Sequence, residues 1–290
     1  LLEDVFGNPP KTVMQDETVI NDFEDLSYSD SKIDEYLQAV LQLEAVACKD
    51  WLTNKADRSV TGRVAQQQNV GSLQLPLSNF GAMALDFRGK SGVATAVGHA
   101  PAIAMIDAAA GSRIAIAESL ANLVFAPLTG GLSAVSLSAN WMWPCKNKGE
   151  DARLYAAVEA VSNFACELGI NIPTGKDSLS MTQKYKDGVV YSPGTVIISA
   201  SAEVSNIRKG VTPNLQKVIG SGLIYIDLTS SPLALGGSSL AQVLNKIGST
   251  SPDIKDVSYF RTVFNAVQDL IEQGLVLAGH DVSSGGLIGT

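Results

Sequence analysis

Two oxygen-bearing side chains lie four residues apart in a stretch that is otherwise small and apolar. The stretch is IAIAESLANLVFA, and the two side chains are Glu118 and Asn122. Residues with this spacing share one face of a helix, about one turn apart, and a carboxylate with an amide oxygen can bind a hard cation such as Mg²⁺. A buried carboxylate could equally be paired with a Lys or Arg from elsewhere. Spacing alone favours an ordinary helix-surface pair.

A second set of oxygen donors precedes a glycine pair near the end of the chain. The run HDVSSGGL, residues 280–287, offers Asp281 as an oxygen ligand and Ser283 as a hydrogen-bonding group, and Gly285 and Gly286 permit close backbone approach. Such a run is typical of a turn that opens a helix and holds an anion or a metal. A glycine turn with an Asp or Ser cap explains the same residues and, for this run taken alone, is favoured.

The run TGKDSLSM, residues 174–181, is similar to the end of a phosphate-binding loop. The full motif is GxxxxGK followed by Ser or Thr, but Ile170 occupies its first glycine position and Asp177 stands at its hydroxyl position. A P-loop is therefore excluded. Lys176 could still contact an anion as a point charge, or pair with a neighbouring acid.

The elements that must position these side chains are indicated by hydrophobic periodicity. Residues 1–30 are turn-rich and acidic and predict a linker or a surface tail, followed by one amphipathic helix from Ser31 to about Asp50. From about residue 55 to 208, strand patterns alternate with helical ones, which favours a layered α/β (α+β) architecture with helices on a sheet. The segments are strands at 72–85, 134–140 and 194–204 and helices at 106–125 and 150–169.

A new cycle of elements is predicted after residue 209. The patterns indicate a strand at 221–228, a glycine turn, and a second strand at 275–281 that leads into HDVSSGGL. Two helices are predicted between these strands, at 239–247 and 260–274. About 80 residues with so few strands are less than a stable domain of this kind needs, so the sequence looks cut at both ends.

Composition excludes several classes of function. The 290 residues carry a formal charge of −8, with 21 Lys and Arg against 29 Asp and Glu, which argues against a nucleic-acid partner. No apolar run approaches the roughly 20 residues of a membrane span, and no signal peptide is visible. The absence of a GxSxG motif gives a hydrolase triad no support. Three widely spaced cysteines, Cys48, Cys145 and Cys166, predict reduced, buried thiols in a cytoplasmic protein.

Several motifs together carry a family resemblance over nearly the whole chain. They occur in the order DRSVTGRVAQQQNVGSLQLPL, HAPAIAMIDAAAGSRIAIAESLAN, LSANWM, GEDARLY, PTGKDSLSM and HDVSSGGL. In this order they closely resemble the phosphoribosylformylglycinamidine synthase family of purine biosynthesis, in its large single-chain bacterial form. The resemblance implies an internal duplication of a two-domain unit similar to aminoimidazole ribonucleotide synthetase, of which this chain would hold the second copy.

The resemblance implies a division of the chain into three parts. Residues 1–54 would contain the end of the preceding repeat, a linker and one helix. Residues 55–208 would form the N-terminal-like domain, and residues 209–290 would begin a truncated C-terminal-like domain. The first synthetase repeat and the glutaminase domain would then be missing partners. Strand edges left open by the truncation would permit pairing with another copy, as a homo-oligomer.

The reaction implied by the resemblance is an ATP-dependent ligation. ATP activates the amide oxygen of formylglycinamide ribonucleotide as an iminophosphate, and ammonia from glutamine displaces the phosphate to give the amidine. The second copy of this family is expected to hold an auxiliary, structural nucleotide with Mg²⁺. The isolated chain is therefore expected to contain no catalytic residue and to be inactive.

The matching positions define an expected site. Cofactors would be ATP or ADP and Mg²⁺, with Ser283 contacting the nucleotide and Glu118, Asn122 and Asp281 contacting the metal. Asn79 occupies a position where the family often has a metal-binding Asp. An amide offers one oxygen and no charge, so Mg²⁺ should bind less tightly.

A substrate cleft shared with the first copy is a further expectation. It would involve Arg58, Thr61 and Lys176, although Arg58 paired with Asp57 in a structural turn explains the same residues. Two classes of function remain open, part of a ligase and a nucleotide-binding structural module. A more distant alternative is an ATP-using enzyme of the selenophosphate synthetase or thiamine monophosphate kinase type.

Overall fold

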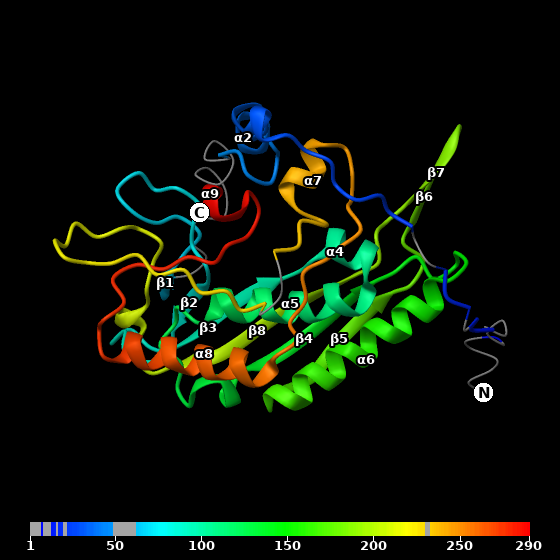
Figure 1. Cartoon of the computed structure of the whole chain (residues 1–290). Helices are drawn as coiled ribbons and strands as arrows, with labels where there is room; N and C mark the ends of the chain where they lie inside the picture. The colour runs from blue at the N-terminus through cyan, green and yellow to red at the C-terminus, as the bar shows by residue number, and fades with distance from the viewer. Residues whose placement is uncertain (1–6, 8–12, 16, 20–21, 49–61, 230–232) are drawn as a thin grey trace.

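A six-stranded sheet organises the chain, in the order β1-β2-β3-β8-β4-β5 (Figure 1). The computed structural model describes residues 7, 13–15, 17–19, 22–48, 62–229 and 233–290. Neighbouring strands are antiparallel except for the parallel pair β4 and β5. The strands are β1 (Val64–Gln66), β2 (Gly81–Ala84), β3 (Gly92–Gly98), β4 (Ser136–Met142), β5 (Asn171–Ser178) and β8 (Thr195–Val204). The predicted α/β architecture is confirmed.

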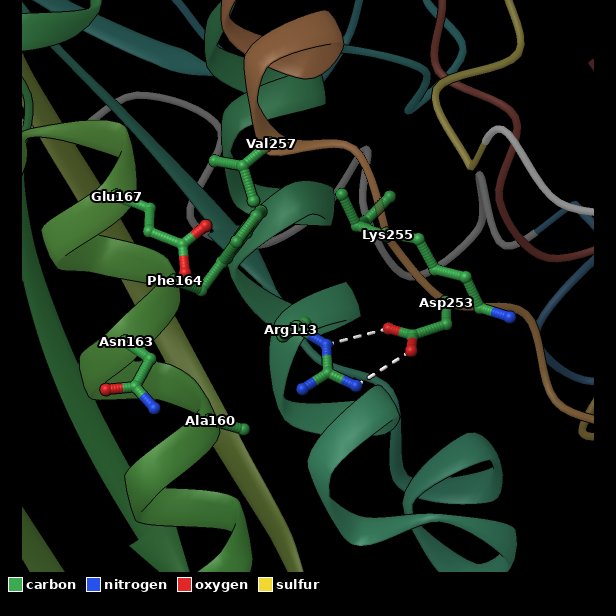
Figure 2. Close-up of a pocket in the computed structure, with 9 residues that line it drawn as sticks. Arg113, Ala160, Asn163, Phe164, Glu167, Asp253, Lys255 and Val257 are labelled. Atoms are coloured by element: carbon green, nitrogen blue, oxygen red, sulfur yellow. Dashed lines mark hydrogen bonds and ion pairs between the residues drawn. The ribbon is translucent and has the colours of Figure 1, made fainter.

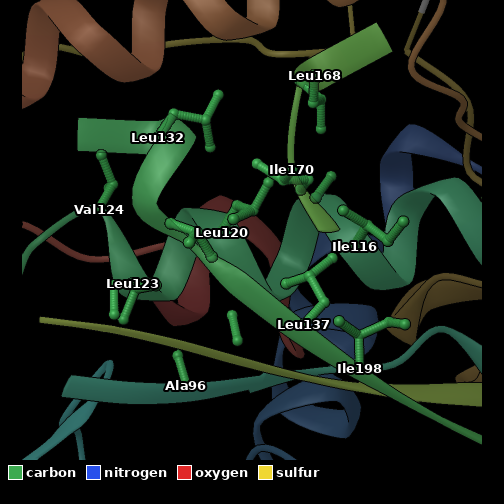
Figure 3. Close-up of a cluster of buried hydrophobic side chains, with 14 of the residues drawn as sticks. Ala96, Ile116, Leu120, Leu123, Val124, Leu132, Leu137, Leu168, Ile170 and Ile198 are labelled. Atoms are coloured by element: carbon green, nitrogen blue, oxygen red, sulfur yellow. The ribbon is translucent and has the colours of Figure 1, made fainter. Parts of the chain in front are cut away.

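Helices cover one face of this sheet. They are α4 (Pro101–Ile106), α5 (Ala108–Leu123) and α6 (Glu150–Leu168), and α5 and α6 lie side by side over the strands (Figure 1). Burial alternates along β3 and β8, as expected when only one face of a sheet is packed. The core between the layers includes Ile116 and Leu120 from α5, with Leu137 and Ile198 from the strands (Figure 3).

The ends of α5 and α6 follow from local chemistry. The Asp107 carboxylate accepts a hydrogen bond of 2.9 Å from the N–H of Ala110 and so caps the start of α5. Gly169 ends α6 in the left-handed conformation, with φ of 75°, where a side chain would be strained. Both helices lie within one or two residues of the predicted ranges 106–125 and 150–169.

The N-terminal part of the chain lies across the surface. It contains a short 3-10 helix η1 (Asp30–Lys32) and helix α2 (Ile33–Leu41). The Nζ atom of Lys148 lies 3.1 Å from a Glu17 carboxylate oxygen, and Lys246 pairs with Glu24. This segment therefore contacts both halves of the molecule, which are the first half at residues 62–208 and the second half at residues 209–290.

The predicted extension of the first helix to about Asp50 is wrong. Helix α2 ends at Leu41. The N–H of Gln42 bonds to the carbonyl of Ala39, and that of Leu43 to the carbonyl of Val40. Bonds over three residues tighten the last turn and end the helix.

The last part of the chain is built mainly from helices and irregular segments. Its elements are η3 (Ile207–Lys209), α7 (Ser239–Val243), α8 (Val257–Glu272) and α9 (Gly286–Gly289). Helix α8 contacts the 3-10 helix η2 (Gly131–Ala134), which follows α5 along the chain. The predicted helix at 260–274 is confirmed by α8. The helix predicted at 239–247 is shorter, because Asn245 has φ of 54° and cannot continue it.

The two strands predicted at 221–228 and 275–281 are absent from the described part of the chain. A strand requires a ladder of hydrogen bonds to a neighbouring strand, and neither segment forms such a ladder with another described segment. Leu223 is 94% exposed and Ile224 is 79% exposed. The apolar pattern of these segments is typical of a strand, but neither segment joins a sheet in the described part of the chain.

A small hairpin extends from the main sheet. Strands β6 (Thr182–Tyr185) and β7 (Gly188–Tyr191) pair antiparallel and are largely exposed (Figure 1). The hairpin follows β5 directly along the chain, so it leaves the sheet at the β5 edge.

The cysteine prediction was partly wrong. All three thiols are free, but Cys48 and Cys166 are exposed and Cys145 is half-buried. Burial, followed by the nearby Asp151 carboxylate, raises the pKa of Cys145 to about 11.

Among the helices of the described residues, none has the length and apolar character needed to cross a membrane.

Helix α8 docks on the ends of α5 and α6. The ring of Phe260 meets that of Phe164 edge to face, with centroids 6.0 Å apart. The Gln268 amide forms hydrogen bonds with the chain just beyond α5. Its Nε2 donates to the carbonyls of Val124 and Ala126, and its Oε1 accepts a 3.0 Å bond from the N–H of Leu128.

An ion pair fastens the segment before α8 to α5. Arg113 donates two hydrogen bonds to Asp253, Nε to Oδ1 at 2.8 Å and Nη2 to Oδ2 at 2.7 Å (Figure 2). The pair lines a surface cavity of about 360 Å³ between α5, α6 and the 253–257 segment. The two hydrogen bonds make the pair bidentate, and both side chains are mostly shielded from water. The pair is therefore a structural contact between residues 62–208 and the last part of the chain, residues 209–290.

Arg113→Met should lower the free energy of unfolding by about 2 kcal/mol, because it leaves a mostly buried carboxylate without its guanidinium. Urea unfolding of Arg113→Met, Asp253→Asn and the double variant would measure the coupling. We expect the double variant to cost less than the sum of the single variants. Additive costs would show that the pair contributes no stability as a pair.

Candidate functional site

Glu118 lies in the middle of α5, where this helix crosses the end of β3. The two backbones approach so closely that a Cβ atom on Gly98 would lie 2.3 Å from the Ala115 carbonyl oxygen and 2.9 Å from the Glu118 Cβ. Glycine at this strand end therefore sets the depth at which Glu118 sits. The helix face of which it is part is largely buried.

The Glu118 carboxyl meets a second carboxyl, that of Asp281. Burial first, then the charge of Asp281 and a hydrogen bond with it, raise the pKa of Glu118 from 4.5 to about 8, and a hydrogen bond from Asn122 partly offsets this. The Asp281 side chain is only 5% exposed. Two carboxyl groups thus share a shielded position, and a proton on Glu118 relieves their repulsion.

The segment that carries Asp281 is held to the start of β2. Asn79 donates from Nδ2 to the carbonyl oxygen of Gly279 at 2.9 Å, and its Oδ1 contacts Nδ1 of His280. The same His280 Nδ1 lies 3.2 Å from Asp281 Oδ1. Gly279 packs closely against the ring of Phe125, where a Cβ would lie 2.1 Å from a ring carbon.

Asn122 completes the group on the helix side. Besides its contact with the Glu118 carboxyl, its Nδ2 donates to the Glu118 carbonyl oxygen at 3.0 Å. The predicted spacing thus places Asn122 beside Glu118, which in turn meets Asp281. Contacts thus link Glu118 and Asn122 on α5 to Asp281, and they link the 279–281 segment to Asn79, which precedes β2.

The glycine turn after Asp281 is tied to α7. The N–H of Gly285 donates to Ser239 Oγ at 2.9 Å, and the carbonyl of Ser283 accepts a 2.9 Å bond from Gly286. Ser283 is exposed, two residues beyond Asp281. The turn does open a helix, α9, which is only four residues long.

Of the expected substrate-cleft residues, the structure describes Lys176, which lies apart from this group. Lys176 is exposed on β5, an edge strand three positions from β3 in the sheet, and its Nζ bonds to Ser178 Oγ. Arg58 and Thr61 lie outside the described residues.

His280 is the residue of this site that sequence reasoning missed. Its ring contacts Asn79 and Asp281. Its adjacency to Asp281 in HDVSSGGL was the available signal.

The donor set fits a hard cation that takes only part of its ligands from the protein. In the ranges that the structure describes, no three His, Cys, Asp or Glu side chains gather as a metal site. Mg²⁺ commonly uses one or two carboxylates and completes its six ligands with water and phosphate oxygens. Burial and the neighbouring Asp281 raise the pKa of Glu118, and a cation bound at this position would offset the charge of both carboxylates.

Comparison with protein families gives two adjoining matches. A family model described as "FGAR-AT PurM_N-like domain" matches residues 48–203. A second model, "AIR synthase related protein, C-terminal domain", matches residues 217–290. The carboxyl pair therefore joins the two matched regions, with Glu118 in the first and Asp281 in the second.

Curated relatives are similar over most or all of the chain. The "Probable phosphoribosylformylglycinamidine synthase, chloroplastic/mitochondrial" of Arabidopsis thaliana is 43% identical over 298 residues, covering 100% of this chain and 21% of the relative. The human "Phosphoribosylformylglycinamidine synthase" is 44% identical over 253 residues, covering 87% and 19%. The chain thus spans about a fifth of the length of these relatives.

Solved structures share the fold. "T. maritima PurL complexed with FGAR" has a TM-score of 0.57 at 13% identity, covering 88% of this chain and 37% of that one. "T. maritima PurL complexed with ADP" has a TM-score of 0.53 at 14% identity, covering 97% and 38%.

Proposed function

Because the chain belongs to the phosphoribosylformylglycinamidine synthase family, we propose that it is part of an ATP-dependent carbon–nitrogen ligase with glutamine as amido donor. The whole protein would convert formylglycinamide ribonucleotide, glutamine and ATP to formylglycinamidine ribonucleotide. ATP phosphorylates the amide oxygen, and ammonia from glutamine then displaces the phosphate. The names of the relatives support this activity, and they give no support to a selenophosphate synthetase or thiamine monophosphate kinase reaction.

The part played by this chain, in our proposal, is to hold an auxiliary nucleotide that is not turned over. The observation that carries it is the shielded pair of carboxyl groups formed by Glu118 and Asp281. Mg²⁺ bound there would supply charge that offsets both the carboxylates and the phosphates of ATP or ADP. Glu118 loses its proton, Asn122 orients the Glu118 carboxylate, and Ser283 in the adjoining turn contacts the phosphates.

The remaining elements of the proposal concern the rest of the ligase. Residues 55–208 and 209–290 act as the N-terminal-like and C-terminal-like domains of the second synthetase repeat. The partners are the first synthetase repeat and the glutaminase domain, and Arg58, Thr61 and Lys176 face the substrate cleft that the two repeats share. The protein works in the cytoplasm, without nucleic acid or membrane, and associates with a second copy as a homo-oligomer.

Calorimetric titration with ADP and Mg²⁺ tests the nucleotide site. We expect binding to the wild-type chain, an affinity at least about tenfold lower in Asp281→Asn because one carboxylate ligand is lost, and no change in Glu159→Gln. Glu159 is an exposed acid on α6 and serves as the matched control. Absence of heat at high micromolar nucleotide, or equal affinity in Asp281→Asn, would overturn the site.

A turnover assay tests the non-catalytic role. The 290-residue chain should form no amidine from formylglycinamide ribonucleotide, ATP and ammonia. Steady-state product formation above that of a Glu118→Ala control would contradict it.

A further inference from the structure

Asn79 uses both ends of its side-chain amide on one neighbouring segment. It is buried before β2, its Nδ2 donates to the Gly279 carbonyl at 2.9 Å, and its Oδ1 contacts His280 Nδ1. An amide oxygen can accept two bonds, but a metal would have to approach an oxygen that already faces the imidazole. The geometry thus gives Asn79 a different task from that of a metal ligand.

The tautomer of His280 follows from its neighbours. Asn79 Oδ1 and Asp281 Oδ1 both lie at Nδ1, and with Asn79 Nδ2 directed at the Gly279 carbonyl, both groups at the ring are acceptors. Nδ1 must therefore carry the hydrogen that they share. One imidazole N–H thus links a residue of the first half to the carboxylate of the second.

We propose that Asn79 and His280 form an interdomain latch that positions Asp281 opposite Glu118, and that Asn79 contributes no ligand oxygen to the cation. The latch consists of Asn79, Gly279, His280 and Asp281. It fixes the backbone at Gly279 and the ring at His280, so that the Asp281 carboxylate is held at the buried position next to Glu118. Asn79 and His280 are positioning residues. The cation part of this proposal rests on the proposed function, whereas the latch itself does not.

Amide hydrogen exchange in the metal-free protein tests the latch directly. The N–H of Gly279 bonds to the Thr212 carbonyl at 3.2 Å and serves as the reporter. Asn79→Ala and His280→Ala should each speed its exchange by at least about tenfold, as a lost hydrogen bond frees the segment to open. His280→Asn, which places an amide N–H near the position of Nδ1, should stay close to wild type. Unchanged exchange in both alanine variants would overturn the latch.

A second variant keeps the test usable if Asn79→Ala does not fold. Asn79→Asp keeps the side-chain size and the contact with His280 but places an acceptor against the Gly279 carbonyl, so it should speed exchange as well. An unchanged rate in Asn79→Asp would count against the latch.

Titration with Mg²⁺ alone separates positioning from ligation. If Asn79 acts through the latch, Asn79→Ala and His280→Ala should weaken Mg²⁺ to a similar degree, and the double variant should be little weaker than either. If Asn79 were a ligand, Asn79→Ala would weaken binding while His280→Ala would not. Failure of the wild-type chain to bind Mg²⁺ would refute the proposed function but leave the exchange result, and hence the latch, standing.

Discussion

The metal-free protein should lose about 2 kcal/mol of its free energy of unfolding between pH 6 and pH 8, and Glu118→Gln should abolish most of that loss. Burial, followed by Asp281, raises the pKa of Glu118 from 4.5 to about 8. Between these two values the folded protein retains a proton that the unfolded chain has released. The stability that the proton provides is complete below pH 4.5 and is lost as the pH rises through about 8.

Urea unfolding at pH 6, 7 and 8 would measure this slope, which is at most about 1.4 kcal/mol per pH unit for one proton. The comparison with Glu118→Gln isolates the contribution of the Glu118 carboxyl from that of all other groups. Gln keeps the shape of the side chain and cannot ionise. If wild type and Glu118→Gln showed the same slope, Glu118 would not be the group that titrates.

Gly98→Ala should destabilise the protein by at least about 3 kcal/mol, at the upper end of the range for overpacked cores. A Cβ at this position would lie 2.3 Å from both the Ala115 carbonyl oxygen and the Ser119 nitrogen. These are backbone atoms of a buried helix, so no side chain can rotate away. Either β3 or α5 must shift, and Glu118 shifts with α5.

Gly188→Ala is the matched control for the denaturation experiment. Gly188 also belongs to a strand, but a Cβ there meets nothing within 4 Å. We expect a change of no more than about 0.5 kcal/mol for it. A cost below about 1 kcal/mol for Gly98→Ala would mean that the helix yields easily, and that Gly98 does not set the depth of Glu118.

Local signals explain which elements could be predicted from the sequence. Helix α6 has acidic residues in its first turn and Gly169 at its end, so its limits are encoded locally. The strands predicted at 221–228 and 275–281 have the right composition, but a strand depends on a neighbour that may lie far along the chain. The hydrophobic pattern of a segment does not indicate whether a second strand is available to pair with it.

The candidate site could be predicted only in part for the same reason. Spacing places Glu118 and Asn122 on one helix face, but no local rule connects them with Asp281. The family resemblance supplied that connection. It did not reveal His280, because a ring that bridges Asn79 and Asp281 is visible only once the two halves are docked.

The contacts of Gln268 have a consequence for how the molecule opens. Its amide donates to the carbonyls of Val124 and Ala126 and accepts from the N–H of Leu128, all in the chain at or after the end of α5. Detachment of α8 would leave all three backbone groups without that partner at once, which is costly for each. Helix α8 and the end of α5 therefore belong to one cooperative unit of partial unfolding. We therefore expect local opening at this contact to break all three hydrogen bonds in one step.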